Sequence, residues 1–427
     1  MPEKMSRRKL LRKGSEAIVA GGVGAYAAAA AGAIPATATF AAAAASKGVD
    51  YYDKLGITPF INAAGTYTIL TASIMPDEVQ AAVALAAKKP VHLLELEEAA
   101  GNYLARKLRC GGALITSGAS AGLTLGTAAC VTMGNKEAIV NIPTDLNGLK
   151  NEVIVQKAHR YEYDHAMRNC GVKVVEIETI EQYQNAFTEK TVMTNFFNAE
   201  DAPISREEWI RVAHQHGVPC FNDAAADVPP ISNLWNYTQM GFDLVAFSGG
   251  KGMRGPQCTG LLLGRKDLID AARLNNSPNS NAVGRGLKVS KEDIIGMVAA
   301  VDWFLSQDDA AMEAEFRKRA DRIAEQVKKV PTVETTVFIP PVANHVPHLL
   351  VTYDPARVRT TGREVMQKMR EGTPRIELNP GTGGAPASAG LPGGENTIIV
   401  GVWMLQPGED VIVGRRLREV LQSAFHS

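Results

Sequence analysis

Short apolar runs alternate with amphipathic stretches over residues 91–289, which is typical of an α/β domain with a mainly parallel sheet. Helical patterns cover Glu95–Leu108 and Ser205–His216, and the second starts with a serine followed three residues later by Glu208, the spacing of a capping box. The apolar runs predict eight strands: Ala113–Thr116, Ala138–Asn141, Glu152–Gln156, Val174–Ile177, Val192–Phe196, Val218–Asn222, Asp243–Phe247 and Gly260–Leu263.

The pattern changes after residue 289. A long helical stretch over Lys291–Val327, with a break near Ser306, leads into a smaller α+β segment over Thr332–Phe425. The segment 380–394 is so rich in Gly and Pro that it predicts a mobile loop. We therefore expect four regions: an export-signal-like segment (1–46), an N-terminal arm (47–80), a large domain (81–290) and a small C-terminal α+β domain (291–427).

The first 46 residues have a pattern of their own. A basic start precedes an apolar stretch over 17–45 that is dominated by Ala and Gly. Within the basic part, Ser6-Arg7-Arg8-Lys9-Leu10-Leu11-Arg12 resembles a twin-arginine export signal, and small residues at 36–38 and 41–45 suit cleavage. Because transfer of Ala from water into hydrocarbon is only weakly favourable, we expect no stable membrane anchor. The twin-arginine-like motif instead leads us to expect an exported, periplasmic protein. The alternative is a basic tail on a cytoplasmic protein.

Composition narrows the class of protein. Of the 427 residues, 45% are hydrophobic and 21% charged, which excludes disorder, collagen and coiled coil as the main state. The formal net charge is +0, and the basic start leaves the remainder slightly acidic, so we expect no nucleic-acid partner. The five cysteines form neither a C-x-x-C motif nor a cluster with histidine in the sequence, so we expect neither a metal site nor a disulfide framework.

Candidate chemistry follows three predicted strands. Asp223 ends one strand, and Lys251 comes twenty-eight residues later, just after another strand and between glycines that we expect to be flexible. A third strand runs into the helix start Ser117-Gly118-Ala119-Ser120. The carboxyl ends of parallel strands border the ligand crevice of an open α/β sheet, so these groups can converge there. Taken singly, each has an ordinary reading as a helix cap, a turn residue or a loop charge.

Together, the three motifs match the needs of one cofactor. A lysine amine can form a Schiff base with an aldehyde, and a carboxylate can keep a pyridine nitrogen protonated. A helix N-terminus can bind a phosphate through its backbone N–H groups, with the hydroxyls of Ser117 and Ser120 added. The sequence therefore predicts pyridoxal 5′-phosphate as the cofactor.

Further motifs give the chain a family resemblance that covers nearly all of residues 50–425. It resembles the bacterial selenocysteine-synthase-like branch of fold-type I pyridoxal-phosphate enzymes, which includes the D-glucosaminate-6-phosphate ammonia-lyases. The matching motifs are INAAGTYT (61–68), NEVI (151–154), HR (159–160), YDH (163–165), DAAA (223–226), SGGK (248–251), RGPQ (254–257), GRGLKVSKE (284–292) and MLQPGE (404–409). The resemblance implies the fold-type I fold and a homodimer or larger homo-oligomer.

The resemblance also implies roles for individual residues. Lys251 would hold the cofactor and move the proton at Cα, and Asp223 would bind the pyridine nitrogen. Ala225 would pack on one face of the ring and His159 would stack on the other; the alternative for His159 is a histidine bonded to backbone. The phosphate would be surrounded by Ser117, Gly118, Ala119, Ser120 and Ser248.

Candidates for the substrate are fewer. Arg375 is a candidate for binding a substrate carboxylate, because a guanidinium group can pair with both oxygens, and its alternative is a surface arginine. Thr66 and Tyr67 are the other substrate candidates. Arg254 and Arg285 are weaker candidates for a phosphate contact or for the subunit interface.

Several activities fit this apparatus. A selenocysteine synthase carries an N-terminal tRNA-binding domain, whereas here that position holds the export-like segment, so we expect a small-molecule substrate. The main hypothesis is an ammonia-lyase that acts by α,β-elimination on a small β-hydroxy amino acid or an amino-sugar acid. Racemase, aldolase, selenium-transferase-like and aminotransferase activities remain alternatives, as does a binding protein that has kept the fold.

Overall fold

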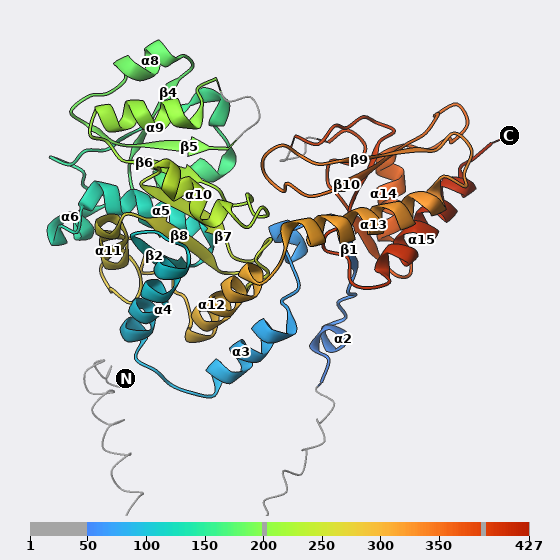
Figure 1. Cartoon of the computed structure of the whole chain (residues 1–427), viewed down its shortest axis with the longest axis horizontal. Coiled ribbons are helices and arrows are strands. Elements are labelled where there is room, and N and C mark those ends of the chain that lie inside the picture. The colour runs from blue at the N-terminus through green and yellow to red at the C-terminus, as the bar shows by residue number, and fades with distance from the viewer. Residues whose placement is uncertain (1–48, 199–202, 386–389, 427) are drawn as a thin grey trace, which may run out of the picture. The chain divides into compact units, whose positions relative to one another are not determined.

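The computed structural model describes residues 49–198, 203–385 and 390–426 (Figure 1). Contacts between residues divide the chain into two units, with the boundary between Ile57 and Thr58. The described part of the first unit contains α2 (Tyr51–Leu55), where Asp50 caps the helix by accepting the Tyr52 N–H at 2.8 Å. The twin-arginine-like segment lies outside the described residues. No helix in the described ranges is both long and apolar enough to span a membrane.

A seven-stranded sheet forms the centre of the second unit. In spatial order its strands are β2 (Gly112–Thr116), β8 (Gly260–Gly264), β7 (Leu244–Ser248), β6 (Cys220–Asp223), β5 (Thr191–Phe197), β3 (Glu152–Gln156) and β4 (Lys173–Ile177). Six of these strands run in one direction, and β8 runs in the opposite direction between β2 and β7. Most strand residues are buried, as expected for a parallel sheet covered on both faces. The predicted mainly parallel sheet is confirmed.

Side chains of β7 show how the two faces are filled. Val245 and Phe247 belong to one hydrophobic core, whereas Leu244 and Ala246 belong to another on the opposite face. Such alternation is the period-2 geometry of a strand. The helices of this region are α3 (Asp77–Ala87), α4 (Leu93–Lys107), α5 (Gly118–Thr132), α6 (Lys136–Asn141), α7 (His165–Arg168), α8 (Ile180–Asn185), α9 (Arg206–Gln215), α10 (Asn233–Met240), α11 (Lys266–Asn275) and α12 (Lys291–Leu305), with 3₁₀ turns η1 (Thr68–Leu70), η2 (Lys157–His159) and η3 (Glu162–Asp164).

One predicted strand is wrong. The run Ala138–Asn141 is the last part of helix α6, because the Asn135 side chain caps the helix by accepting the N–H groups of Glu137 and Ala138. A cap of this kind favours the helix where a short apolar run fits either element. The strand predicted over Val218–Asn222 is shifted, since β6 extends to Asp223 and that carboxylate is the last strand residue.

The C-terminal region has its own sheet and core. Strands β9 (Glu334–Phe338), β10 (His348–Thr352) and β12 (Ile398–Gly401) form an antiparallel sheet in the order β12-β10-β9. Around it lie α13 (Asp309–Val327), α14 (Gly362–Arg370) and α15 (Glu409–Ser423). Strand β1 (Ile61–Ala63) comes from the predicted N-terminal arm but pairs in parallel with β11 (Ile376–Leu378). The arm therefore contributes to the C-terminal core.

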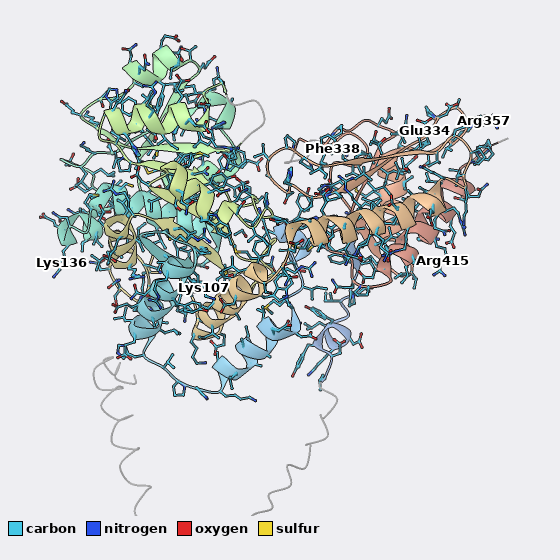
Figure 2. All side chains as sticks on the ribbon, in the orientation of Figure 1. Lys107, Lys136, Glu334, Phe338, Arg357 and Arg415 are labelled. Atoms are coloured by element: carbon cyan, nitrogen blue, oxygen red, sulfur yellow. The ribbon has the colours of Figure 1, made fainter. Side chains whose placement is uncertain are left out.

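The predicted helix break near Ser306 is confirmed, since α12 ends at Leu305 and α13 begins at Asp309. The buried side chains of α12 belong to a core beside the large sheet, whereas those of α13 belong to the C-terminal core. The chain therefore passes from one hydrophobic core to the other between α12 and α13, after the predicted boundary at residue 290. Figure 2 labels Lys107 of α4, whose amine pairs with Asp302 of α12 at 3.2 Å on the surface.

The Gly- and Pro-rich segment contains no helix or strand in its described residues, but its first part is held in place. Residues 381–383 are buried, and the Gly383 N–H donates to the Thr397 carbonyl at 2.9 Å. The Ile399 N–H donates to the Thr382 hydroxyl at 3.0 Å. These bonds fix the start of the predicted loop against β12.

Candidate active site

Asp223 and Lys251 lie at the carboxyl ends of neighbouring parallel strands. Asp223 ends β6 and pairs in register with Ala246 of β7, and Lys251 follows β7 by three residues. Burial is the largest influence on both groups: it raises the pKa of the Asp223 carboxyl and lowers the pKa of the Lys251 amine. Their mutual attraction acts in the opposite direction on each. The predicted carboxylate and amine are therefore brought together in a desolvated place.

Two donors fix the Asp223 carboxylate. Its Oδ1 accepts the Ala225 N–H at 3.0 Å, and its Oδ2 accepts the hydroxyl of Tyr161. Both bonds lower the pKa of Asp223 and so partly oppose the effect of burial. The Tyr161 ring stacks on Phe197 of β5, with centroids 4.3 Å apart. Tyr161 was missed in the sequence, although it stands between two motifs of the family resemblance.

The N-terminus of α5 lies at the same edge of the sheet. Ser117 precedes this helix and makes no capping bond with its side chain, and Gly118 has a φ of +83° with open space where a Cβ would stand. Ser117 and Gly118 are partly exposed, Ser120 is exposed and Ala119 is buried. Uncapped N–H groups at the end of a fifteen-residue helix suit a phosphate.

Strand register explains how this helix meets the Lys251 segment. Gly260 of β8 pairs with Thr116 of β2 on one side and with Ser248 of β7 on the other. Ser248 and the start of α5 are therefore separated by one intervening strand, or about 10 Å. A Cβ on Gly260 would stand 2.3 Å from the Gly118 carbonyl carbon. Only glycine allows β8 to pass so close to α5, a requirement that the sequence did not reveal.

The glycines around Lys251 have a different role from the predicted one. A Cβ on Gly249 would stand 2.2 Å from the Thr259 hydroxyl, and one on Gly252 would stand 2.2 Å from the Val228 carbonyl. The Gly249 N–H also donates to the Thr259 carbonyl at 2.8 Å. These glycines permit close packing rather than flexibility, so the backbone that carries Lys251 is firmly positioned.

His159 is buried at the end of η2, close to the carboxyl end of β3. Its Nδ1 accepts the Phe197 N–H at 3.3 Å, whereas its Nε2 has no hydrogen-bond partner among the described residues. Burial lowers the pKa of His159 to about 4, so the ring is neutral at neutral pH. A buried nitrogen without a partner is a group that a bound ligand can satisfy. Its stacking on a cofactor ring stays a prediction.

A second buried carboxylate, Asp227, was not assigned a role in the sequence. It accepts hydrogen bonds from the Asn198 amide and, at 3.0 Å, from the Tyr237 hydroxyl. Burial raises the pKa of Asp227 to about 6, with a smaller contribution from the charge of Asp223. The charge of Asp227 also raises the pKa of Lys251. The amine therefore faces two carboxylates in its surroundings.

Thr66 and Tyr67 lie in a segment that contacts the Lys251 loop. Thr66 is buried, and the Tyr67 hydroxyl accepts the Asn379 amide at 3.1 Å. Close by in sequence, the Ser73 hydroxyl donates to the Gly250 carbonyl at 2.6 Å. This bond brings the arm next to Lys251, so the arm can contribute to the site.

The candidate arginines have other partners. Arg375 forms an ion pair with Glu377 at 2.8 Å, and the structure gives it no contact with the Lys251 segment among the described residues. Arg254 donates to the Trp403 carbonyl at 2.9 Å, and this bond links the Lys251 loop to the C-terminal core. Burial lowers the pKa of Arg254 to about 10. Arg285 is exposed. The substrate role of Arg375 stays a prediction.

The residues at this edge of the sheet fit pyridoxal 5′-phosphate. A desolvated amine, a fixed carboxylate, an uncapped helix N-terminus and a buried imidazole nitrogen without a partner supply the groups that an aldehyde, a pyridine nitrogen and a phosphate need.

Comparisons with known proteins bear on the family, the fold and the cofactor of this chain. The family model described as L-seryl-tRNA selenium transferase matches residues 60–342. A D-glucosaminate-6-phosphate ammonia lyase from Salmonella typhimurium is 28% identical over 399 residues, which cover 87% of this chain and 98% of that protein. A 5′-C-glycyluridine monooxygenase-decarboxylase from a Streptomyces species is also 28% identical, over 77% of this chain and 83% of its own length.

The solved structure of a D-glucosaminate-6-phosphate ammonia-lyase superposes with a TM-score of 0.75 and 25% identity, over 88% of this chain and 99% of that one. The predicted fold-type I fold and the predicted family resemblance are confirmed. Pyridoxal 5′-phosphate is accordingly the cofactor.

Proposed function

Because the chain belongs to the L-seryl-tRNA selenium transferase family and is an enzyme of the pyridoxal-phosphate-dependent lyase type, we propose that it removes ammonia by α,β-elimination. The substrate class is a small β-hydroxy amino acid or an amino-sugar acid. The observation that carries the proposal is the pair Asp223 and Lys251, desolvated at adjacent strand ends beside the uncapped start of α5. The relative named as an ammonia lyase supports this reaction.

Lys251 is the residue that moves protons. When bound, pyridoxal 5′-phosphate supplies an electron sink for the bond broken at Cα. Burial lowers the pKa of Lys251 and increases the neutral fraction of its amine, which can then take the Cα proton. The β-hydroxyl leaves with a proton as water, and hydrolysis of the dehydrated product gives a 2-oxo acid and ammonia without net oxidation. The packed glycines fix the backbone from which this side chain extends.

Other residues would bind and orient. Asp223, held by the Ala225 N–H and the Tyr161 hydroxyl, would keep the proton on a pyridine nitrogen. The first turn of α5, with Ser117 and Ser248 near it, would hold the phosphate. His159 would contribute a neutral ring and a donor at Nε2.

The test is a screen of purified protein against D- and L-amino acids and amino-sugar acids. Elimination releases ammonia and a 2-oxo acid in equal amounts, and Lys251→Ala should release neither. Recovery of the substrate with inverted Cα and without ammonia would indicate a racemase instead. Release of an aldehyde with a shortened amino acid would indicate an aldolase.

A second candidate rests on the relative named as a monooxygenase-decarboxylase. An activity of that kind would consume O₂ and release CO₂ from an α-amino acid, whereas elimination needs neither. Turnover should therefore be the same with and without O₂ in the proposed reaction. If removing O₂ stops turnover and CO₂ is released in its presence, the elimination hypothesis is wrong.

We also propose that the protein is exported in folded form through a twin-arginine route. The support is the sequence Ser6-Arg7-Arg8 with two following leucines and an Ala- and Gly-rich stretch. Replacing Arg7 and Arg8 together by Lys should keep a cofactor-loaded precursor in the cytoplasm. A variant that still reaches the periplasm with cofactor bound would contradict the route.

The proposed assembly is a homodimer or larger homo-oligomer, as the family resemblance implies. Light scattering of the eluted protein measures its mass directly. A mass of one chain at the concentration used for activity would contradict the proposal.

A further inference from the structure

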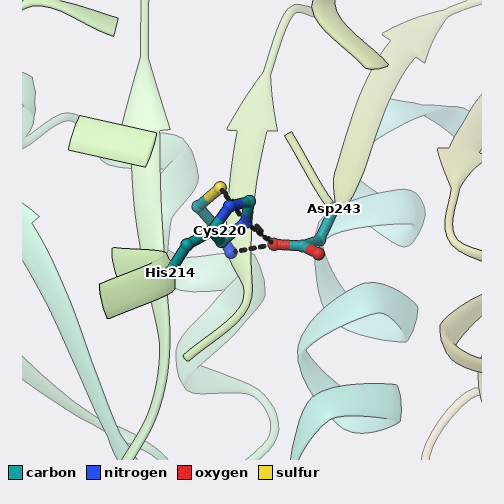
Figure 3. A group of neighbouring side chains, drawn as sticks. All are labelled: His214, Cys220 and Asp243. Atoms are coloured by element: carbon teal, nitrogen blue, oxygen red, sulfur yellow. Dashed lines mark hydrogen bonds and ion pairs between the residues drawn. The ribbon is translucent and has the colours of Figure 1, made fainter. Parts of the chain in front are cut away.

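A second cluster of polar side chains lies at the opposite ends of the strands that carry the candidate active site. His214 is in the last turn of α9, Cys220 is the first residue of β6, and Asp243 directly precedes β7 (Figure 3). Asp223 and Lys251, in contrast, follow the carboxyl ends of the same two strands. This His–Cys–Asp cluster is therefore distinct from the cofactor site.

The donor atoms of the cluster have the spacing of a metal coordination sphere. His214 Nε2 is 2.9 Å from Asp243 Oδ2 and 3.8 Å from Cys220 Sγ, and the sulfur is 3.5 Å from the same carboxylate oxygen. Tetrahedral zinc with ordinary bond lengths to N, O and S places such donors about 3.4–3.6 Å apart. Each observed distance lies within roughly half an ångström of that range. Small side-chain adjustments would suffice to enclose an ion.

The surroundings of the cluster resemble those of a site with one open position. Cys220 is fully buried and Asp243 nearly so, whereas the His214 side chain is 45% exposed. The second oxygen of Asp243 accepts Arg265 Nη1 at 3.1 Å, an outer contact that orients the carboxylate. The Cys220 N–H also donates to Asp243 at 2.8 Å. An ion would reach the cluster from the side of His214 and could keep a water there.

We propose that His214, Cys220 and Asp243 bind a divalent transition metal of the zinc type. Thiolate and imidazole donors favour such a metal over magnesium and calcium, which prefer oxygen ligands only. On binding, the Cys220 thiol loses its proton to solvent and the sulfur bonds to the metal. A neutral His214 binds through Nε2 once its proton is on Nδ1, and a protonated His214 first loses its Nε2 proton to solvent. The sequence led us to expect no metal site because it was judged on cysteine spacing alone. That spacing does not show that α9, β6 and the start of β7 bring these three residues together.

The test uses purified, untagged holoenzyme titrated with Co²⁺ after chelator treatment. We expect one equivalent to bind, with tetrahedral cobalt bands in the red, where the cofactor does not absorb. Cys220→Ser should remove the contribution of the sulfur ligand to the cobalt spectrum. His214→Ala should weaken cobalt binding more than about tenfold, since even changes to residues that only contact metal ligands cost that much in affinity. His214→Ala alters an exposed residue, so it tests the site even if Cys220→Ser folds poorly.

Matched controls come from the same chain. Cys170 is also a buried thiol, bonded to the Thr124 carbonyl at 3.2 Å, and Cys170→Ser should keep full cobalt binding. His216 stacks on Phe187 two residues from His214, and His216→Ala should behave likewise. Zinc should also raise the thermal midpoint of the wild type but not of His214→Ala. No cobalt uptake by the wild type, or equal uptake by His214→Ala and His216→Ala, would overturn the proposal.

Discussion

Polar residues lie at both ends of strands β6 and β7, and the two ends differ in whether these residues have hydrogen-bond partners. At the amino end, Asp243 is saturated: it accepts from His214, from Arg265 and from a backbone N–H. At the carboxyl end, the Lys251 amine is desolvated, and the buried His159 Nε2 has no hydrogen-bond partner among the described residues. A protein that leaves buried polar groups without partners has sites ready for a ligand. The comparison separates a cluster whose polar groups already bond to one another, and would exchange those bonds for a metal ion, from one that a cofactor completes.

The largest expected effect is at Lys251. Lys251→Ala should lower turnover by at least about a thousandfold, because it removes both the cofactor link and the proton carrier. Borohydride reduction followed by peptide mapping should find the cofactor on this lysine in the wild type. Lys288→Ala, at an exposed lysine, is the control and should keep its activity. A cofactor found on another lysine would show that the site is assigned wrongly.

Asp223→Ala should come next, with a loss of turnover on the order of a hundredfold or more. Without the carboxylate, the pyridine nitrogen loses the charge that keeps it protonated, while the lysine link remains. Asp223→Glu retains the charge with a different reach and should recover part of the rate. Near-native turnover of Asp223→Ala would contradict the proposed role. Absorbance of the bound cofactor checks that each variant is loaded.

Gly260→Ala tests the close approach between β8 and α5. The added methyl would meet the Gly118 backbone at 2.3 Å, so the start of α5 must move. We expect a free energy of unfolding lower by about 1–3 kcal/mol and weaker cofactor binding. Gly286→Ala is the control, since a Cβ there has nothing within 4 Å. Equal cofactor affinity in the two variants would show that phosphate binding does not depend on the close approach of β8 to α5.

Tyr161→Phe should have a smaller effect, about tenfold on kcat. The Tyr161 hydroxyl lowers the pKa of Asp223, so its loss raises that pKa and the carboxylate takes up a proton at higher pH. The acidic limb of the pH–rate profile should therefore move to higher pH. Tyr163→Phe, at an exposed neighbour, should leave the profile in place. A lower rate with an unmoved acidic limb would indicate a role other than holding Asp223.

The smallest effect is expected from salt and tRNA. Binding of a small substrate does not require the protein to neutralise a run of phosphates, so KM should change less than about threefold with salt. Over the same range of salt, a protein with several phosphate contacts to a nucleic acid loses about a thousandfold or more in affinity. Added tRNA should not inhibit. A steep fall in affinity with salt, or comigration with tRNA, would favour a nucleic-acid substrate.

The sequence by itself determined most of the sheet and the main parts of the candidate site. Apolar runs between turn residues are local, and they placed β3 at its observed residues. Because a parallel sheet brings all its strand ends to one edge, Asp223, Lys251 and Ser117 could be expected to meet once their strands were identified. The prediction failed at Ala138–Asn141, where one cap residue decided between helix and strand.

Only the tertiary structure decided which polar groups are satisfied. The hydrogen bond from Tyr161 to Asp223 and the pairing of β1 with β11 join segments whose proximity no local pattern records. The same holds for His214, Cys220 and Asp243, which lack metal-ligand spacing in the chain and meet across a helix and two strands. Burial, and with it the pKa of a buried group, depends on everything packed around a residue. The sequence therefore determines where reactive side chains stand along the strands, and the packed fold determines what each of them can do.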